Sequence, residues 1–388
     1  MDIKKFSAKL SKNVNTPKTE NLVRELKDTT AVLIKNYLFS LYHDKSFSPN
    51  FRVVRFLGYI NHHHPMLKAP FVIYNENLGV YRFDDMYLFV TLKIFNQDYE
   101  ITFKTSFIEL ARTNRIQERN HMYISSPEGR NADVEEIFKY LKEHAIKKSN
   151  LVNKILEFNS YKQDDSDVLS CLRSIKLPKT SLKDVFIPDK KKHHIERFIY
   201  EVNHYSCVKK NSIRLLLAGN PGTGKTNLVN AIITETFGKA TVILCNGTDF
   251  PIDPIFKFCE LFEPVILVID DLDFVVGDRA NSVSNDTLSK FLTLLDGVVP
   301  RKIFLLATST KKRVIDTAAS RPGRFSVILD IAEIEPQNYL QLVKRETDDK
   351  KIIAFFNEKT LSEFKTKKVT GALLVNLIKG ISKNSPKS

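Results

Sequence analysis

The sequence has only four cysteines, and they lie far apart with no CxxC pair. This spacing argues against a disulfide framework and against a zinc site, so we expect reduced structural thiols. The chain also lacks an apolar run of about 18 to 20 residues, which a membrane-spanning helix needs. Its first residues contain no apolar stretch that could act as a signal peptide. We therefore expect a cytoplasmic protein without a membrane span.

Basic residues outnumber acidic ones, 59 Lys and Arg against 45 Asp and Glu, which leaves a net charge of +14. A charge of this size is typical of proteins that bind nucleic acids. Lysine is the commoner basic residue here, however, and it suits bidentate base recognition less well than arginine does. The charge is also spread along the chain. A solvated basic surface is the favoured interpretation, and contact with a nucleic-acid backbone stays open as the alternative.

The chain has 388 residues, of which 43% are hydrophobic, and this allows two or three domains with cores of their own. Residues 1–45 have apolar side chains at helical spacing, whereas 51–105 consist of short β-branched and aromatic runs separated by turns. Residues 121–126 indicate a further strand, and 132–158 again have helical spacing. Together they predict an α+β region, which ends at a polar linker over 159–170.

From about residue 176 the pattern changes to apolar runs that lead into loops or helices. The runs are IRLLLAG, ATVILC, PVILVID and KIFLLAT. Such runs are typical of buried parallel strands. From about residue 335 the spacing is helical throughout.

A phosphate-binding loop is indicated by the pattern GxxxxGK[ST] between a strand-like run and a helical run. Its residues are Gly219, Asn220, Pro221, Gly222, Thr223, Gly224, Lys225 and Thr226. Glycines let backbone N–H groups close around phosphates, and the helix N-terminus adds partial positive charge. Lys225 is expected to reach the β- and γ-phosphates, and Thr226 is expected to bind Mg²⁺. The loop therefore predicts ATP and Mg²⁺ as cofactors.

The strand-like run that ends in Asp270 and Asp271 has the position and composition of the second half of such a site. Asp270 is expected to hold Mg²⁺ through water. Asp271 stands where related ATPases usually carry a glutamate that positions the attacking water, and aspartate is one methylene shorter. A misplacement of about 1 Å can cost roughly a hundredfold in rate. Slow hydrolysis, or an ATP switch without hydrolysis, therefore stays open.

The last apolar run, at 302–310, ends in three hydroxyl residues. We take Ser309 as the residue that contacts the γ-phosphate or a water, since its hydroxyl can hydrogen-bond either of them. Thr308 and Thr310 are the alternatives if the register of the strand differs.

The stretch Arg321-Pro322-Gly323-Arg324-Phe325 follows a hydrophobic strand and resembles the second region of homology of AAA ATPases. In that family these two arginines reach into the ATP site of the neighbouring subunit. The resemblance therefore implies that Arg321 and Arg324 act in trans. Ser326 departs from the family pattern, which usually has an aspartate there.

Other segments narrow the resemblance. Residues 288–297 resemble the LSxLLNxLDG helix of the AAA branch that includes the mitochondrial chaperone of respiratory complex III assembly. Residues 182–186 resemble the segment before the ATPase core, and 370–374 resemble a helix of the lid. The aromatic–hydrophobic–Gly pore loop of unfolding AAA motors is not visible, and Phe250 is either a pore contact or a packed loop aromatic.

We expect an α/β fold, with a P-loop AAA module at 176–332 whose parallel sheet is flanked by helices. A small helical lid at 333–388 follows, and an α+β domain at 1–160 precedes the module and recognises a substrate or partner. The resemblance implies an ATP hydrolase that works as a homo-oligomeric ring of six or seven subunits on an unknown protein client. The alternatives are a nucleic-acid-associated ATPase and the slow or non-hydrolysing switch.

Overall fold

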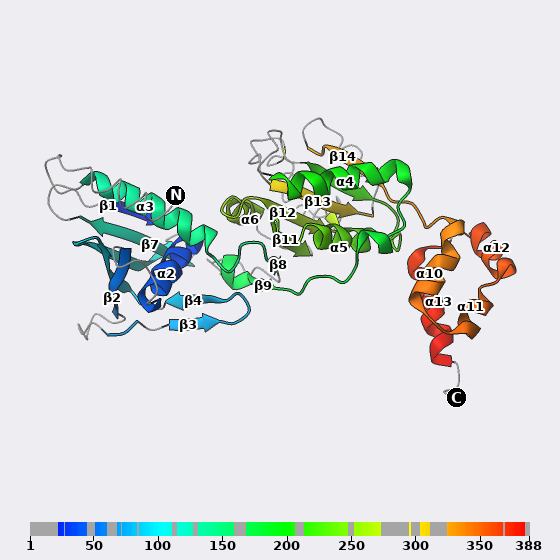
Figure 1. Cartoon of the computed structure of the whole chain (residues 1–388), viewed down its shortest axis with the longest axis horizontal. Helices are drawn as coiled ribbons and strands as arrows, with labels where there is room; N and C mark the ends of the chain where they lie inside the picture. The colour runs from blue at the N-terminus through cyan, green and yellow to red at the C-terminus, as the bar shows by residue number, and fades with distance from the viewer. Residues whose placement is uncertain are drawn as a thin grey trace. The chain divides into compact units, whose positions relative to one another are not determined.

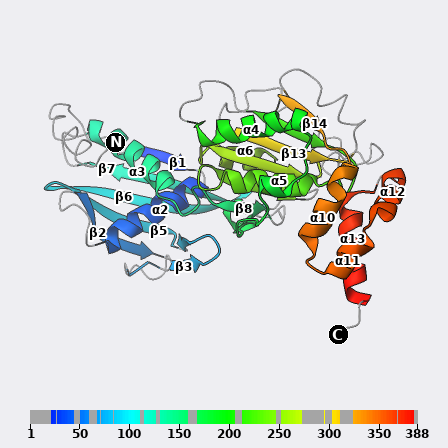
Figure 2. The same ribbon diagram turned by 45° about the vertical axis from the view of Figure 1, so that its right-hand side comes forward.

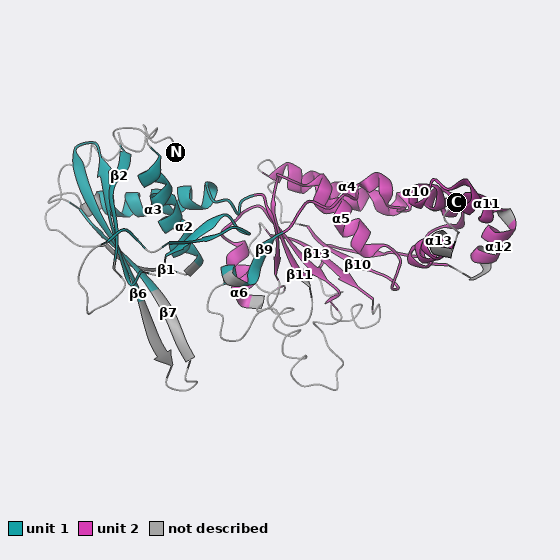
Figure 3. Ribbon diagram, turned by 90° about the horizontal axis from the view of Figure 1, so that it is seen from below, with its two compact units in different colours: residues 1–152, 161–174 teal, residues 153–160, 175–388 magenta. Residues whose placement is uncertain are grey.

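The computed structural model describes residues 22–26, 28–44, 51–59, 68–70, 72–83, 85–110, 115–126, 131–158, 168–205, 213–246, 252–272, 295, 303–310, 324–367 and 369–384. The chain divides into two compact units (Figure 3). Unit 1 comprises residues 1–152 and 161–174, and unit 2 comprises 153–160 and 175–388.

Unit 1 is built on a five-stranded antiparallel sheet in the order β1-β7-β6-β5-β2. A separate hairpin pairs β3 with β4, and helices α2 and α3 pack against each other and against the larger sheet (Figure 2). The elements are β1 (Leu22–Leu26), α2 (Asp28–His43), β2 (Phe51–Tyr59), β3 (Val72–Asn75), β4 (Val80–Phe83), β5 (Tyr87–Ile94), β6 (Gln97–Leu110), β7 (Arg115–Ser125), α3 (Asn131–Lys147), a 3-10 turn (Val168–Cys171) and β9 (Leu172–Ser174). The antiparallel sheet expected over 51–105 and the strand at 121–126 are confirmed.

Two segments with helical spacing are strands. Leu22–Leu26 forms the edge strand β1, because pairing with β7 outweighs the local spacing of its apolar residues. The helix expected over 132–158 ends at Lys147, and Ile155–Phe158 becomes β8. A turn containing Asn153, whose φ is +58°, separates the two. A short apolar run such as Ile155–Phe158 cannot be assigned to helix or strand by periodicity alone.

Unit 2 contains most of a seven-stranded sheet in the order β14-β10-β13-β12-β11-β8-β9 (Figure 1). Every neighbouring pair from β14 to β8 is parallel. The elements are β8 (Ile155–Phe158), a 3-10 turn (Leu182–Asp184), α4 (Asp189–Asn203), β10 (Arg214–Ala218), α5 (Lys225–Glu235), β11 (Thr241–Asn246), α6 (Ile252–Cys259), β12 (Val265–Asp270), β13 (Ile303–Ser309), β14 (Val327–Asp330), a 3-10 turn (Pro336–Asn338), α10 (Tyr339–Glu346), α11 (Lys350–Phe355), α12 (Glu358–Lys367) and α13 (Gly371–Asn384). The four expected strands and the helical C-terminal region are confirmed, whereas β14 was not predicted.

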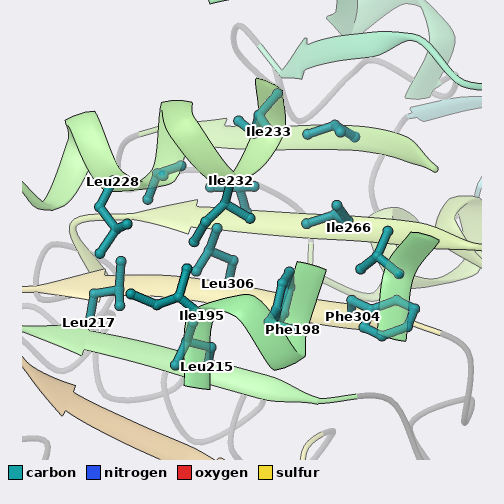
Figure 4. Close-up of a cluster of buried hydrophobic side chains, with 14 of the residues drawn as sticks. Ile195, Phe198, Leu215, Leu217, Leu228, Ile232, Ile233, Ile266, Phe304 and Leu306 are labelled. Carbon is teal, nitrogen blue, oxygen red and sulfur yellow. The ribbon is translucent and has the colours of Figure 1, made fainter. Parts of the chain in front are cut away.

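One hydrophobic core joins helices α4 and α5 to the sheet (Figure 4). Phe198 of α4 meets Phe304 of β13 edge-on, with ring centroids 5.7 Å apart. Leu228 and Ile232 of α5 are fully buried in the same cluster. This packing holds α5 rigidly on the sheet, and so it also holds the loop between β10 and α5. A second cluster is formed by the C-terminal helices, which we call the lid.

The carboxyl ends of β10, β12 and β13 lie at one edge of the sheet because these strands are parallel neighbours. β13 sits between β10 and β12, although it follows both of them in the chain. Crevices at such points of reversed strand order are the usual ligand sites of open α/β sheets. The α/β class with a parallel sheet flanked by helices is confirmed.

Cys171, Cys245 and Cys259 are buried free thiols. Burial raises the pKa of both Cys245 and Cys259, so neither forms a reactive thiolate near neutral pH. These three fit the expected structural role. Within the described residues, no helix is both long and apolar enough to cross a membrane.

Candidate functional site: a phosphate-binding pocket

A pocket of about 480 Å³ opens beside the loop between β10 and α5. All its lining residues belong to unit 2. They come from the segment before the sheet (184–186), from the loop and the start of α5 (221–227), from the ends of β12 and β13 (Asp271 and Thr310), and from the lid (Ile334, Leu342, Arg345, Gly371, Ala372, Val375 and Asn376). The pocket thus gathers most of the segments that the sequence motifs singled out.

Glycines shape the loop at the positions where other residues would not fit. Gly222 and Gly224 have φ of +79° and +94°, which L-residues with side chains rarely adopt. A Cβ on Gly219 would lie 2.2 Å from the carbonyl oxygen of Ile331. Helix α5 then begins at Lys225. The loop can therefore wrap an anionic group with its backbone, at the positive end of a buried helix.

Lys225 lies inside this loop with 7% of its surface exposed. Its Nζ donates to the carbonyl oxygens of Gly219 and Asn220, at 2.8 and 3.0 Å. These contacts hold the ammonium group at the loop, where it adds a fixed positive charge. The arrangement suits a phosphate chain, because the lysine and the helix N-terminus act on the same anion.

Asp270 ends β12 beside two hydroxyl groups. Thr308 donates from Oγ1 to Asp270 Oδ1 at 2.5 Å, and Thr226 Oγ1 lies 3.5 Å from Asp270 Oδ2. The pairing of Ile269 with Ala307 between β12 and β13 accounts for the contact with Thr308. The hydroxyl of Thr226 and the carboxylate of Asp270 are oxygen donors of the kind that Mg²⁺ prefers. One or two such donors plus phosphate oxygens form its usual site, so the residues fit this cation.

Asp271 follows in an unusual backbone conformation, with φ of +51°. Its N–H donates to Thr308 Oγ1 at 2.8 Å. Thr308 therefore links the two carboxylate residues, accepting from the backbone of one and donating to the side chain of the other. Aspartate is among the residues that tolerate this conformation, whereas bulkier residues do so rarely.

Three hydroxyl residues at the end of β13, which the sequence could not distinguish, lie in different surroundings. Ser309 is fully buried, and its backbone carbonyl accepts from the N–H of Gly219 at 3.1 Å. Thr310 lines the pocket, whereas Ser309 does not. Thr308 contacts Asp270. The geometry favours Thr308 and Thr310, the alternative registers, over Ser309 for a direct role in the pocket.

The lid contacts the loop and the 184–186 segment at separate points. The N–H of Ala372 donates to the carbonyl of Gly222 at 3.3 Å, and Asn220 Nδ2 donates to Glu333 Oε1 at 2.8 Å. Arg345 donates to the carbonyl oxygen of Asp184, and its guanidinium lies over the ring of Phe186, 5.6 Å from the centroid. A ligand in the pocket would therefore touch elements from both ends of unit 2.

The two arginines expected to act in trans are described unequally. Arg321 lies outside the described residues. Arg324 is buried in its own chain, with 6% of its surface exposed. A role in trans stays a prediction for both arginines.

Some expected features lie outside the described residues, namely Phe250 and, apart from Leu295, the helix at 288–297. Two arginines that sequence reasoning did not single out do belong to the structure of this region. Arg345 lines the pocket, and Arg214 contacts the backbone of Arg324. Neither has a local motif, because the backbone carbonyls that they contact lie 81 to 161 residues away in the chain.

Replacing Thr308 with valine should lower stability by about 1–3 kcal/mol, because the N–H of Asp271 loses its buried acceptor. Nucleotide turnover should fall by roughly 10- to 100-fold, since Asp270 loses the donor that orients it. Thr308→Ser keeps the hydroxyl and should stay near the parent protein. Thermal melts and steady-state turnover measure the two effects. A valine variant equal to the parent in both would show that this hydroxyl has no such role.

Comparison with known proteins supports the site. Residues 215–333 match the family model described as "ATPase family associated with various cellular activities (AAA)". The proteasome-activating nucleotidase of Methanococcus vannielii is 30% identical over 151 residues, which is 34% of this chain and 37% of that protein. The ATP-dependent zinc metalloprotease FtsH 2 of Petrotoga mobilis is 27% identical over 223 residues, 52% of this chain and 35% of that protein.

Protein SAV of Sulfolobus acidocaldarius is 28% identical over 225 residues, 53% of this chain and 28% of that protein. The chain thus spans about a third of the length of these three curated relatives. The matched segment contains β10 from Leu215 on, the loop, Asp270 and β13, whereas the pocket residues of the 184–186 segment and of the lid lie outside it. The parallel sheet and the glycine-shaped loop agree with this match, which makes residues 215–333 similar to the AAA family model.

Proposed function

We propose that unit 2 binds ATP with Mg²⁺ in this pocket and hydrolyses it, and that the chain works as a homo-oligomeric ring that remodels a protein client. The observation that carries the proposal is the pocket itself. The phosphate loop, the Asp270–Thr308 pair and the lid all line it or adjoin it. A nucleotide bound there would contact both the sheet and the lid, so its hydrolysis can alter the angle between them.

Each residue has a separate task in this proposal. The loop backbone and Lys225 bind the phosphates, while Thr226 and Asp270 hold the cation. Mg²⁺ would neutralise charge that develops on the phosphate oxygens. Asp271 positions the attacking water and accepts its proton. Thr310, at the end of β13, is placed to contact the terminal phosphate or that water.

The ring and the trans-acting arginine rest on the family resemblance. Arg321 is the proposed finger, and Arg324 joins it only if its buried side chain turns outward. A protein client is supported by relatives whose names contain "proteasome-activating nucleotidase" and "metalloprotease". Residues 288–297 support the finer resemblance to the branch of the complex III assembly chaperone. In this proposal 176–332 together with the paired strand β8 form the ATPase domain, 333–388 form the lid, and the rest of 1–160 is the domain that recognises the client.

Stimulation of ATP turnover tests the proposed client class. Turnover by the full chain should rise with an unfolded or loosely folded protein, and salt should change this effect little. If duplex or single-stranded DNA stimulates turnover instead, and moderate salt abolishes the effect, the chain is a nucleic-acid-associated ATPase. The absence of turnover in a confirmed oligomer would favour the switch, the interpretation to which the short side chain of Asp271 points.

A further inference from the structure

Arg214 is the first residue of β10, the strand that leads into the phosphate loop. Its side chain is half-buried and does not line the pocket. The guanidinium Nη1 donates to the carbonyl oxygen of Leu295 at 2.9 Å and to that of Arg324 at 3.4 Å. One side chain thus contacts the backbone of two segments that lie 81 and 110 residues further along the chain.

The backbone of Arg214 also makes two hydrogen bonds, both to Ser326. Its N–H donates to Ser326 Oγ at 3.2 Å, and its carbonyl accepts from the N–H of Ser326 at 2.8 Å. From there β14 continues parallel to β10, with Leu215 opposite Val327. Ser326, the residue that departs from the family pattern, thus supplies an acceptor to the P-loop strand. Three hydrogen bonds thus tie Arg324 and Ser326 to Arg214 at the start of that strand.

The chemistry of this contact requires arginine. A planar guanidinium carries several donors in a fixed geometry, so it can serve two carbonyl oxygens that face it from different segments. A lysine ammonium is a single point charge on a flexible stem and holds two such acceptors less rigidly. Burial lowers the pKa of Arg214, yet arginine starts so far above neutrality that it stays charged.

We propose that Arg214 is a positioning residue, which holds Arg324 and Ser326 in register with the P-loop strand of the same chain. The inference rests on the proposed function, in which the segment that carries Arg321 and Arg324 completes the ATP site of a neighbouring subunit. Arg214 would then influence the neighbour's site and leave its own pocket unchanged. The strand that begins at Arg214 ends just before the chain's own phosphate loop, so one strand adjoins both the loop and the proposed contact with the neighbour.

Mixed assemblies separate the two sites. A subunit with Arg321→Ala keeps its own pocket but offers no finger, whereas a subunit with Lys225→Ala has a dead pocket but an intact finger. Mixing the two should restore part of the turnover that each lacks alone. A finger donor that carries both Lys225→Ala and Arg214→Met should restore roughly tenfold less or worse, since small misplacements of a catalytic group cost one to two orders of magnitude. Methionine keeps an apolar stem and removes every hydrogen-bond donor of the side chain at position 214.

Two further subunits that donate the finger, each also carrying Lys225→Ala, provide the comparison. A donor with Arg214→Lys should restore an intermediate turnover. A donor with Lys192→Ala, which breaks an exposed ion pair with Glu196 on α4, should restore as much as Lys225→Ala alone. All mixtures are matched for size and for incorporation of the donor. If the subunit with Arg214→Met does not fold or does not enter the assembly, the subunit with Arg214→Lys replaces it in the test. That subunit must then restore less turnover than the subunit that keeps Arg214.

The outcomes distinguish the inference from the function on which it rests. Full restoration of turnover by the folded subunit with Arg214→Met would overturn the role of Arg214 and leave the shared site intact. Full restoration by the subunit with Arg214→Lys has the same meaning when the methionine variant cannot be used. No restoration by the simple Lys225→Ala donor would overturn the shared site, and the role of Arg214 with it. As a separate readout, Arg214→Met alone should lower kcat while the Kd for nucleotide in its own pocket stays unchanged.

Discussion

Replacing Lys225 with alanine should lower ATP turnover by about 100- to 1,000-fold and weaken nucleotide binding, because the pocket loses a preorganised charge aimed at the phosphates. Lys225 is buried at the loop, and its ammonium is held by the carbonyls of Gly219 and Asn220. These contacts hold the charge at the loop before a nucleotide binds. Turnover at saturating ATP and the Kd for a fluorescent nucleotide measure the two effects.

The matched control is Lys239→Ala, which removes an exposed lysine from the same unit shortly after α5. It should leave turnover and binding unchanged. Thermal melts of both variants show whether each one is folded, because Lys225 also holds its own loop through the carbonyls of Gly219 and Asn220. Parental turnover in a folded Lys225→Ala variant would place the ATP site elsewhere.

Replacing Asp271 with asparagine should lower turnover by about 100- to 10,000-fold, the range expected for loss of a general base, while nucleotide affinity changes little. Asparagine suits this test because it tolerates the φ of +51° as well as aspartate does. The N–H of residue 271 can still donate to Thr308. The substitution therefore removes the carboxylate and keeps the backbone, so a change in rate reports chemistry.

An exposed carboxylate provides the comparison. Asp253→Asn, in the first turn of α6, removes a similar charge from the surface of the same unit and should have no effect on turnover. Asp271→Asn should also accumulate the ATP-bound state, which suits it for trapping a client. Undiminished turnover in Asp271→Asn would show that another group, or water alone, takes the proton.

The phosphate site could be predicted from the sequence because its residues are local. The loop glycines, Lys225 and Thr226 lie within eight consecutive positions, and Asp270 ends an apolar run that reads as a buried strand. Strand register was harder, because adjacent residues of a strand point to opposite faces. Ser309 and Thr310 differ by one position, and only the structure shows that the second one lines the pocket.

Other features could not be read locally. Leu22–Leu26 and Ile155–Phe158 have helical spacing, yet each is a strand because a partner strand is available in the fold. Arg345 and Arg214 have no motif, because they act on backbone carbonyls that are distant in the chain. The burial of Arg324 is a tertiary property as well, and the local motif does not show it.

The most direct test of the account is the specific ATP turnover of the full chain as a function of its concentration, with the molecular mass measured in parallel by light scattering. We predict that turnover per chain rises steeply as the ring assembles, and that Arg321→Ala assembles equally well but stays at the low level of the monomer. Turnover per chain that is independent of assembly, or unaffected by Arg321→Ala in a confirmed oligomer, would contradict the shared ATP site.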